Sequence, residues 1–177
     1  MLKRVAIIGP ESTGKSTLAK DLAEALNTTF VPEYARAYID QLDRPYQYED
    51  LLAIAQGQAE QEDSWSNSVN EFLVIDTTLT IIRVWSEHRY GKCDPWILAE
   101  EQRRKYDLTL VCDIDLPWEE DPQREHPHLR EHFFEVYKEH AEAHPPFAII
   151  RGDRQARVKL ALKAIQQLSG GSKPPES

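Results

Sequence analysis

The segment at residues 9–16, GPESTGKS, constrains the fold of this chain more than any other. It follows the apolar run at residues 5–8 and precedes a segment with helical periodicity over residues 17–26. Strand, glycine loop and helix in this order are the context that a P-loop requires. In such a loop, backbone N–H groups surround phosphate oxygens at the N-terminus of a helix. The sequence therefore predicts a site for a nucleoside triphosphate.

The residues expected to hold the phosphates come from this loop and the start of the helix: Gly9, Glu11, Ser12, Thr13, Gly14, Lys15, Ser16 and Thr17. We expect Lys15 to reach the β- and γ-phosphates and the hydroxyl of Ser16 to hold Mg²⁺. A glycine turn that only joins strand to helix is the alternative, but it gives no reason for Lys15 and Ser16 to occur together. The loop alone does not distinguish phosphoryl transfer from hydrolysis or nucleotide sensing.

Composition limits the kind of protein further. A chain of 177 residues fits one domain with a continuous hydrophobic core. Its net charge of −9 argues against a surface for nucleic acid or anionic membrane, which clustered Lys and Arg would bind. There is no apolar leader or membrane-length apolar stretch, so we expect a cytoplasmic protein. Cys93 and Cys112 lack CxxC spacing and are expected to be free thiols. The oligomeric state stays open.

Short apolar runs alternate with helical segments along the rest of the chain. Strands are expected at residues 28–31, 72–75, 108–112 and 147–150, and helices at residues 49–66, 78–90, 95–106, 131–143 and 154–168. This alternation predicts an α/β domain at residues 1–168 with helices on both faces of a parallel sheet, and ligands at the carboxyl ends of the strands. Residues 113–130 have no apolar period and contain three prolines, which indicates a functional loop. Residues 169–177 are expected to form a disordered tail.

Two acidic residues follow predicted strands. Asp76 ends the run 72–75 and is a candidate Mg²⁺ ligand, although it could instead cap the helix that begins near Thr78. Glu33 could accept the proton of an attacking substrate hydroxyl. The alternative is a surface glutamate paired with Arg36. Tyr34 could stack on a flat ring or belong to the core.

The long loop and the last strand end supply further candidates. Arg124 and Arg130 could stabilise a phosphoryl group in transfer, with Trp118 as an anchor, and a closed loop would keep water away from the γ-phosphate. A solvated polar loop is the alternative. Gly152 could allow the backbone to approach an adenine ring, or could simply connect strand to helix. The histidines between residues 126 and 144 match no standard zinc spacing and are expected to be solvated.

Several of these motifs together resemble a known family: the ribosylnicotinamide kinase domain of the bacterial NAD-salvage protein, within the P-loop nucleoside and nucleotide kinases. The resemblance covers nearly the whole chain. It depends on GPESTGKS at 9–16, NTT at 27–29 followed by EYAR at 33–36, IDT at 75–77, Tyr90-Gly91 ahead of Pro95, and Trp118 followed by Asp121 and Arg124.

The resemblance implies a five-stranded parallel sheet of adenylate-kinase-like topology with a lid at about residues 113–130. It implies a kinase that uses ATP and Mg²⁺ to phosphorylate the ribose 5′-hydroxyl of ribosylnicotinamide, a small nucleoside-like substrate. The substrate pocket would include Glu33, Tyr34, Arg36, Asp76 and Thr78, and the ATP site Trp118 and Gly152. Arg124 and Arg130 would neutralise the phosphates together with Lys15, so that Lys15, Glu33, Arg124 and Arg130 form the catalytic set.

Two positions depart from the family pattern. The family has Trp directly before Glu-Tyr and Asp directly after Asp-Thr, whereas this chain has Pro32 and Thr78. Neither residue can stack on or attract a cationic pyridinium ring as Trp and Asp would. Another nucleoside or a nucleotide is therefore the alternative acceptor. A P-loop ATPase or switch that acts on a protein partner is the alternative class. The family's adenylyltransferase and DNA-binding modules have no counterpart in this sequence, so we expect a stand-alone kinase.

Overall fold

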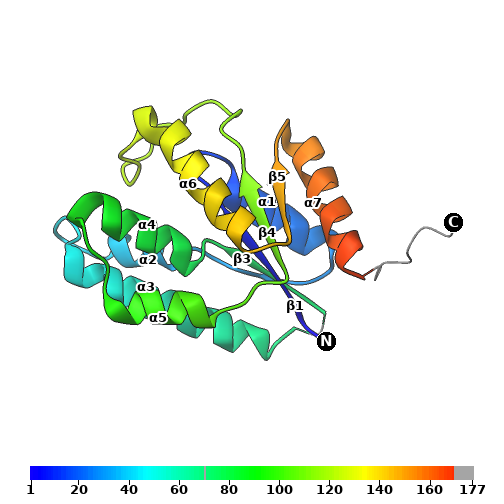
Figure 1. The fold of residues 1–177 in the computed structure, drawn as a ribbon, viewed down its shortest axis with the longest axis horizontal. Coiled ribbons are helices and arrows are strands. Elements are labelled where there is room, and N and C mark those ends of the chain that lie inside the picture. Colours follow the sequence, from blue (N-terminus) through cyan, green and yellow to red (C-terminus); the bar gives the residue numbers. More distant parts are fainter. Residues whose placement is uncertain (70, 170–177) are drawn as a thin grey trace, which may run out of the picture.

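A single parallel sheet organises the molecule (Figure 1). The computed structural model describes residues 1–69 and 71–169. The strands are β1 (Lys3–Ile8), β2 (Phe30–Val31), β3 (Phe72–Asp76), β4 (Leu108–Cys112) and β5 (Phe147–Ile150). Their order across the sheet is β2-β3-β1-β4-β5, and every neighbouring pair is parallel. The expected five-stranded α/β architecture is confirmed.

Helices connect consecutive strands, as parallel strands require. They are α1 (Lys15–Ala25), α2 (Tyr34–Asp40), α3 (Tyr48–Ser66), α4 (Leu79–Tyr90), α5 (Pro95–Arg103), α6 (Arg130–Ala143) and α7 (Arg154–Ser169), with a 3-10 turn η1 (Pro127–Leu129) before α6. The segment between β4 and α6 forms no strand or α-helix and corresponds to the predicted lid.

The helices cover both faces of the sheet (Figure 1). On one face, α1 and α7 pack against the central strands through residues such as Leu22, Ile165 and Val5. On the other face, α4 and α6 meet β1 and β4 through Ile8, Val111 and Phe133 and their neighbours. Helices α2, α3, α4 and α5 share a further apolar cluster. The core is therefore split between the two faces, and the carboxyl ends of the strands stay open to a ligand.

The ends of two helices differ from expectation. Helix α5 ends at Arg103, not near Tyr106, because the Arg104 guanidinium is buried against Glu62, Asp63 and Glu100 and its backbone is extended. Helix α7 includes Ser169, which we expected to belong to the tail. The rest of the proposed tail, residues 170–177, lies outside the described residues.

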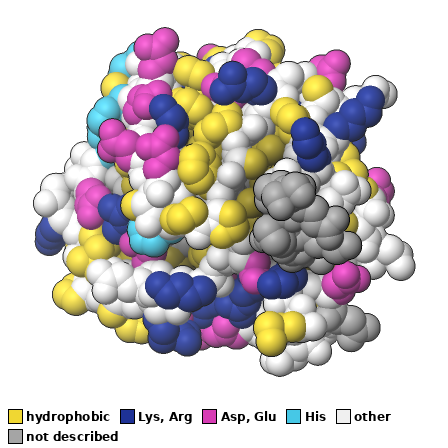
Figure 2. Space-filling model, turned by 45° about the vertical axis from the view of Figure 1, so that its right-hand side comes forward, with side chains coloured by type: hydrophobic (Ala, Val, Ile, Leu, Met, Phe, Trp, Pro, Cys, Tyr) yellow, Lys and Arg dark blue, Asp and Glu magenta, His cyan; other side chains and the backbone are white. Residues whose placement is uncertain are grey.

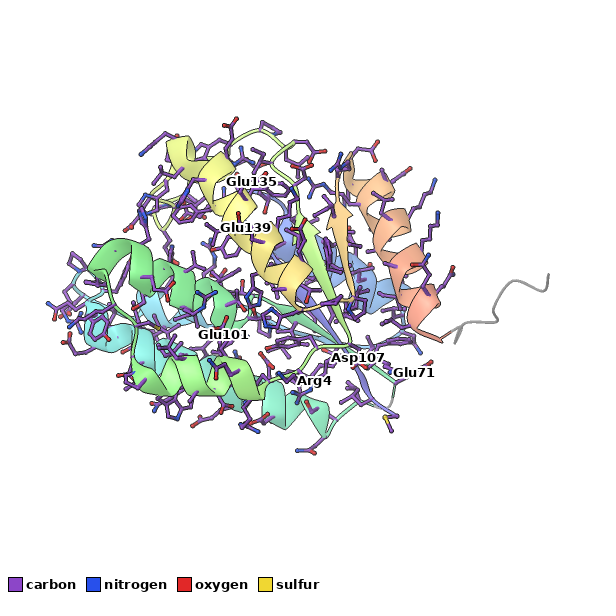
Figure 3. All side chains as sticks on the ribbon, viewed as in Figure 1. Arg4, Glu71, Glu101, Asp107, Glu135 and Glu139 are labelled. Carbon is purple, nitrogen blue, oxygen red and sulfur yellow. The ribbon has the colours of Figure 1, made fainter. Side chains whose placement is uncertain are left out.

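Charged groups connect β1 and β4 at the end of the sheet opposite the P-loop. The Asp107 carboxylate accepts a hydrogen bond of 2.8 Å from the backbone N–H of Arg4 and one of 2.8 Å from the Lys3 ammonium. Figure 3 shows Arg4 and Asp107 beside the start of β1. These contacts hold the amino ends of β1 and β4 together, far from the ends where ligands bind.

Both cysteines lie within the described residues. Cys93 and Cys112 are free thiols, as expected. Within residues 1–69 and 71–169, His, Cys, Asp and Glu form no cluster of three or more that could hold a metal ion. In the same part of the chain, every helix is too short or too polar to cross a membrane. Acidic and histidine side chains gather on one part of the surface next to apolar ones (Figure 2).

Candidate active site

The P-loop owes its shape to two glycines. Gly9 has a φ of 146°, and a Cβ there would lie 2.9 Å from the carbonyl oxygen of Cys112. Gly14, in the left-handed conformation with a φ of 75°, occupies the N-cap position of α1. Only glycine adopts both conformations without strain. The loop therefore passes close to β4 and turns directly into the N-terminus of α1, where N–H groups are available for an anion.

Hydrogen bonds within the loop fix its side chains. The buried Thr13 hydroxyl donates to the carbonyl oxygen of Pro10 at 2.7 Å. The Lys15 ammonium donates to the same oxygen at 2.8 Å. Lys15 is therefore folded back over the loop, so its charge faces the concave side on which phosphates bind in P-loops.

Asp76 and Ser16 form the central polar contact of the site. Asp76 ends β3 and is paired in register with Ile7 of β1, directly before the P-loop. The Ser16 hydroxyl donates to its Oδ2 at 2.5 Å, and its buried Oδ1 has no hydrogen-bond partner in the described chain. Burial raises the pKa of Asp76 to about 6. Asp76 does not cap α4, whose N-cap residue is Thr78.

A cleft of about 460 Å³ opens in front of the P-loop. One side is formed by the P-loop and α1, and the opposite side by Glu33 and Arg36 at the start of α2 together with Ile81 and Trp85 of α4. Lid residues including Gln123, Arg124 and His126 cover it. The cleft thus brings the phosphate loop, the candidate base Glu33 and the candidate cation Arg124 around one space.

The lid lies closed on the P-loop. The Glu11 carboxylate accepts hydrogen bonds from the backbone N–H groups of Glu125 and His126 at 3.0 to 3.2 Å. The Ser12 hydroxyl accepts one from the backbone N–H of Glu119 at 2.8 Å. The Arg130 guanidinium donates to the carbonyl oxygens of Ser12 and Leu116 at 3.0 and 2.9 Å. Two residues expected to touch phosphate, Glu11 and Ser12, therefore hold the lid.

The lid also contacts α2 and α4 across the cleft. Arg36 pairs with Asp121 at 3.0 Å, and Gln123 donates to Asp40 at 2.6 Å. Arg89 of α4 pairs with Glu125 at 2.7 Å. The partner of Arg36 is therefore a lid residue, and the alternative ion pair between Arg36 and Glu33 does not form.

Some residues expected in the site lie outside the cleft lining. Tyr34 packs over Gly57 in the core cluster of α2 and α3, and Thr78 is buried with 1% of its surface exposed. Trp118 is half-buried, with its ring 6.0 Å from the Arg130 guanidinium. Gly152 has a φ of 93°, and its N–H donates to Asp115. These four residues are not among the residues that line the cleft, and neither are Asp76 and Arg130.

Sequence reasoning missed Arg157. This α7 residue is 3% exposed, and its guanidinium donates to the carbonyl oxygens of Thr13 at 2.7 Å, Gly152 at 2.9 Å and Asp113 at 3.1 Å. It also pairs with Asp115. Arg157 thus joins the P-loop to the loops after β4 and β5. The available signal was its spacing of four from Ala161, which places it on the apolar face of α7.

The fold and cleft define a class. A parallel sheet of this order, with a P-loop after β1, an acid at the end of β3 and a lid over the cleft, is the P-loop kinase-like α/β fold. Residues 4–157 match the family described as "AAA domain", and the chain belongs to that family.

Individual relatives agree with this class. The chain is 33% identical over 129 residues to the "Trifunctional NAD biosynthesis/regulator protein NadR" of Escherichia coli (strain K12) and to its namesake of Salmonella typhimurium. Each match covers 70% of this chain and 31% of the relative, so the chain spans about a third of these relatives' length. The resemblance inferred from the sequence is confirmed.

Solved structures share the fold. A crystal structure of NadR protein in complex with NAD and AMP-PNP matches with a TM-score of 0.77 at 23% identity, over 99% of this chain and 51% of that one. Deoxyadenosine kinase from M. mycoides, with products dCMP and dCDP bound, matches with a TM-score of 0.64 at 14% identity, over 93% and 99%. At these identities the likeness establishes the fold alone.

Proposed function

We propose that this protein is an ATP-dependent kinase that phosphorylates the ribose 5′-hydroxyl of a nucleoside, with ribosylnicotinamide as the first candidate. The observation that carries the proposal is the cleft in which the P-loop faces Glu33 beneath a closed lid. The NadR relatives are named for NAD biosynthesis, and solved NadR structures contain NR in one case and AMP-PNP in another. Both observations support a kinase in NAD metabolism.

Ser16 and Asp76 fit a magnesium ion. Their side-chain oxygens are 2.5 Å apart, and the buried Oδ1 of Asp76 lacks a hydrogen-bond partner in the described chain. Mg²⁺ prefers such oxygen ligands together with phosphate oxygens. We infer that Ser16 and Asp76 would hold the ion, which supplies positive charge to the β- and γ-phosphates.

The protein's own side chains divide the remaining work. Lys15 exchanges its contact with the Pro10 carbonyl oxygen for the phosphates, which carry far more negative charge. Glu33 receives the proton of the acceptor hydroxyl as that oxygen attacks phosphorus. Arg124 lines the cleft from the lid and stabilises the charge on the transferred group. Arg130 acts by fixing the lid to Ser12.

The closed lid favours transfer to an alcohol over a nucleotide switch or ATPase. Lid contacts with Glu11 on one side and Arg36 on the other bridge the cleft between the P-loop and α2. Excluding water protects the γ-phosphate from hydrolysis until the acceptor hydroxyl is in place. An ATPase has no acceptor alcohol for which hydrolysis would be a competing reaction. A different nucleoside remains the alternative acceptor, because Pro32 is exposed and neither Pro32 nor Thr78 lines the cleft.

The test is production of ADP from ATP and Mg²⁺ against a panel of ribosides that includes ribosylnicotinamide. We expect ADP to form only with an accepted riboside, and Lys15→Ala to lower the rate at least about 100-fold, since it removes a charge that acts on the transition state. ADP release at the same rate with and without any riboside would favour the ATPase or switch.

A further inference from the structure

One wall of the cleft is built from apolar and aromatic side chains of α4 and α6. Ile81 and Trp85 come from α4, and Phe133 and Tyr137 from α6. Glu135 and Glu139 project from the exposed face of α6 (Figure 3), so Phe133 and Tyr137 lie on its inner face. A flat ring beside a sugar fits a wall of this composition.

Tyr137 differs from the rest of this wall because it carries a hydroxyl group that has no hydrogen-bond partner in the described residues. The side chain is 3% exposed and packs in a cluster with Ile8, Val111 and Phe133. Its hydroxyl takes part in none of the hydrogen bonds of the described residues, and Tyr137 lines the cleft. The hydroxyl oxygen is not among the buried polar atoms that lack a partner, so it reaches the open space of the cleft. The hydroxyl is therefore suited to a partner that arrives in the cleft.

The electrostatic surroundings keep this phenol protonated, so its hydroxyl can donate a hydrogen bond. Burial raises the pKa of Tyr137, and the nearby carboxylates of Glu11 and Glu33 raise it further. The phenol stays protonated at neutral pH. Within the described residues, the Glu11 carboxylate accepts hydrogen bonds from lid N–H groups and none from this phenol.

The position also indicates which part of the acceptor would meet Tyr137. In the proposed function the 5′-hydroxyl lies at Glu33, so the sugar that carries it lies next to Glu33. Tyr137 shares the cleft with Glu33 and lies within the range of its charge. The nearest polar groups of a nucleoside held this way are the sugar hydroxyls, while its base extends toward Trp85.

We propose that Tyr137 determines acceptor specificity by donating a hydrogen bond to a 2′- or 3′-hydroxyl of a nucleoside bound against the wall of Ile81, Trp85 and Phe133. This inference rests on the proposed function and deepens it, because it assigns the acceptor class: a riboside read through its sugar. Tyr137 is not a member of the P-loop or of the lid, and nothing in the motif pattern points to it.

The experiment compares wild-type protein with Tyr137→Phe on the riboside that the wild type phosphorylates fastest, and on the 2′-deoxy and 3′-deoxy forms of that riboside. We expect kcat/KM for the riboside to fall about 3- to 10-fold through KM, the range of one neutral hydrogen bond, with KM for ATP unchanged. For one of the two deoxy forms, wild type and variant should be equal, since the partner hydroxyl is missing.

A matched control removes a phenol elsewhere. The Tyr106 hydroxyl donates to the buried Glu62 at 3.1 Å, outside the cleft. Tyr106→Phe should lower the unfolding temperature and leave acceptor KM unchanged, whereas Tyr137→Phe should leave the unfolding temperature of the unliganded protein unchanged. Equal kinetics of wild type and Tyr137→Phe on the riboside, or equal losses on all three substrates, overturn the assignment of Tyr137. Failure of the wild type to phosphorylate any riboside overturns the proposed function itself.

Discussion

The chemistry assigned to this site depends on where individual carboxylates lie. Asp76 is buried at the end of β3, and one of its oxygens is held by Ser16. Glu33 stands at the N-cap position of α2 and lines the cleft. A buried carboxylate suits a metal ligand, whereas a half-buried one facing the cleft can exchange a proton with a substrate. We therefore propose different roles for the two acids, because their burial differs.

We expect the ionised carboxylate of Asp76 to lower the stability of the unliganded protein at neutral pH. Burial raises its pKa from the ordinary value of 3.8 to about 6, so the folded state binds the proton more tightly than the unfolded state. The penalty on the ionised form is full above about pH 6 and disappears as the pH falls toward 4. In metal-free protein, we expect Asp76→Asn to raise the free energy of unfolding by about 2–3 kcal/mol at pH 8.

Urea unfolding of both proteins at pH 8 and pH 4.5 measures this effect. The stability difference should shrink at the lower pH, while Mg²⁺ should stabilise only the wild type in the presence of ATP. A variant less stable than the wild type at pH 8 would contradict the assigned burial penalty. Asp113, which is also acidic and follows β4, provides the matched control as Asp113→Asn.

Residues of local motifs were predictable from the sequence, whereas residues placed by packing were not. Gly9, Gly14 and Lys15 belong to a contiguous pattern whose shape follows from backbone conformation alone. Arg157 and Tyr137 enter the site only because α7 and α6 pack on opposite faces of the sheet. Beyond the helical periodicity of each segment, a single sequence carries no signal that α6 and α7 contribute residues to the same site.

At the scale of elements, we expect the lid to be the segment that opens and closes. It contains a single 3-10 turn and is held mainly by hydrogen bonds and ion pairs to Glu11, Ser12, Arg36 and Arg89. Polar contacts at a surface are individually weak, so a set of them allows opening and closing. The prolines of this segment and its lack of an apolar period predicted a loop. The sequence could not predict that Glu11, within the P-loop, would hold it.

Glu11→Ala should release the lid. The carboxylate accepts from two backbone N–H groups, and the variant leaves both without this partner. We expect amide hydrogen exchange at residues 119–129 to accelerate about 10-fold, with exchange in β1 and β4 unchanged. Glu24→Ala, an exposed change on α1, is the control and should alter neither region. Unchanged exchange in the lid of Glu11→Ala would show that other contacts suffice to keep it closed.

At the scale of the whole molecule, the P-loop lies at the centre of the sheet. The groups that surround it come from several different elements. β1 lies between β3 and β4, so Asp76 arrives from one neighbour and the lid begins at the end of the other. Arg157 adds a third connection from α7. The alternation of strands and helices predicted the parallel sheet, and the resemblance gave its topology. Tyr34 and Thr78 were expected in the substrate pocket, but packing of α2 and α4 directs them into the core.

We propose that the γ-phosphoryl group of ATP is transferred to a nucleoside hydroxyl beside Glu33. Mass spectrometry of a reaction containing the protein, ATP, Mg²⁺ and ribosylnicotinamide detects this transfer. We expect a riboside that gains one phosphate in step with ADP formation, and a Glu33→Gln variant that binds ATP normally but forms product at least about 100-fold more slowly. ADP that accumulates without any phosphorylated riboside, or a Glu33→Gln variant as fast as the wild type, would contradict it.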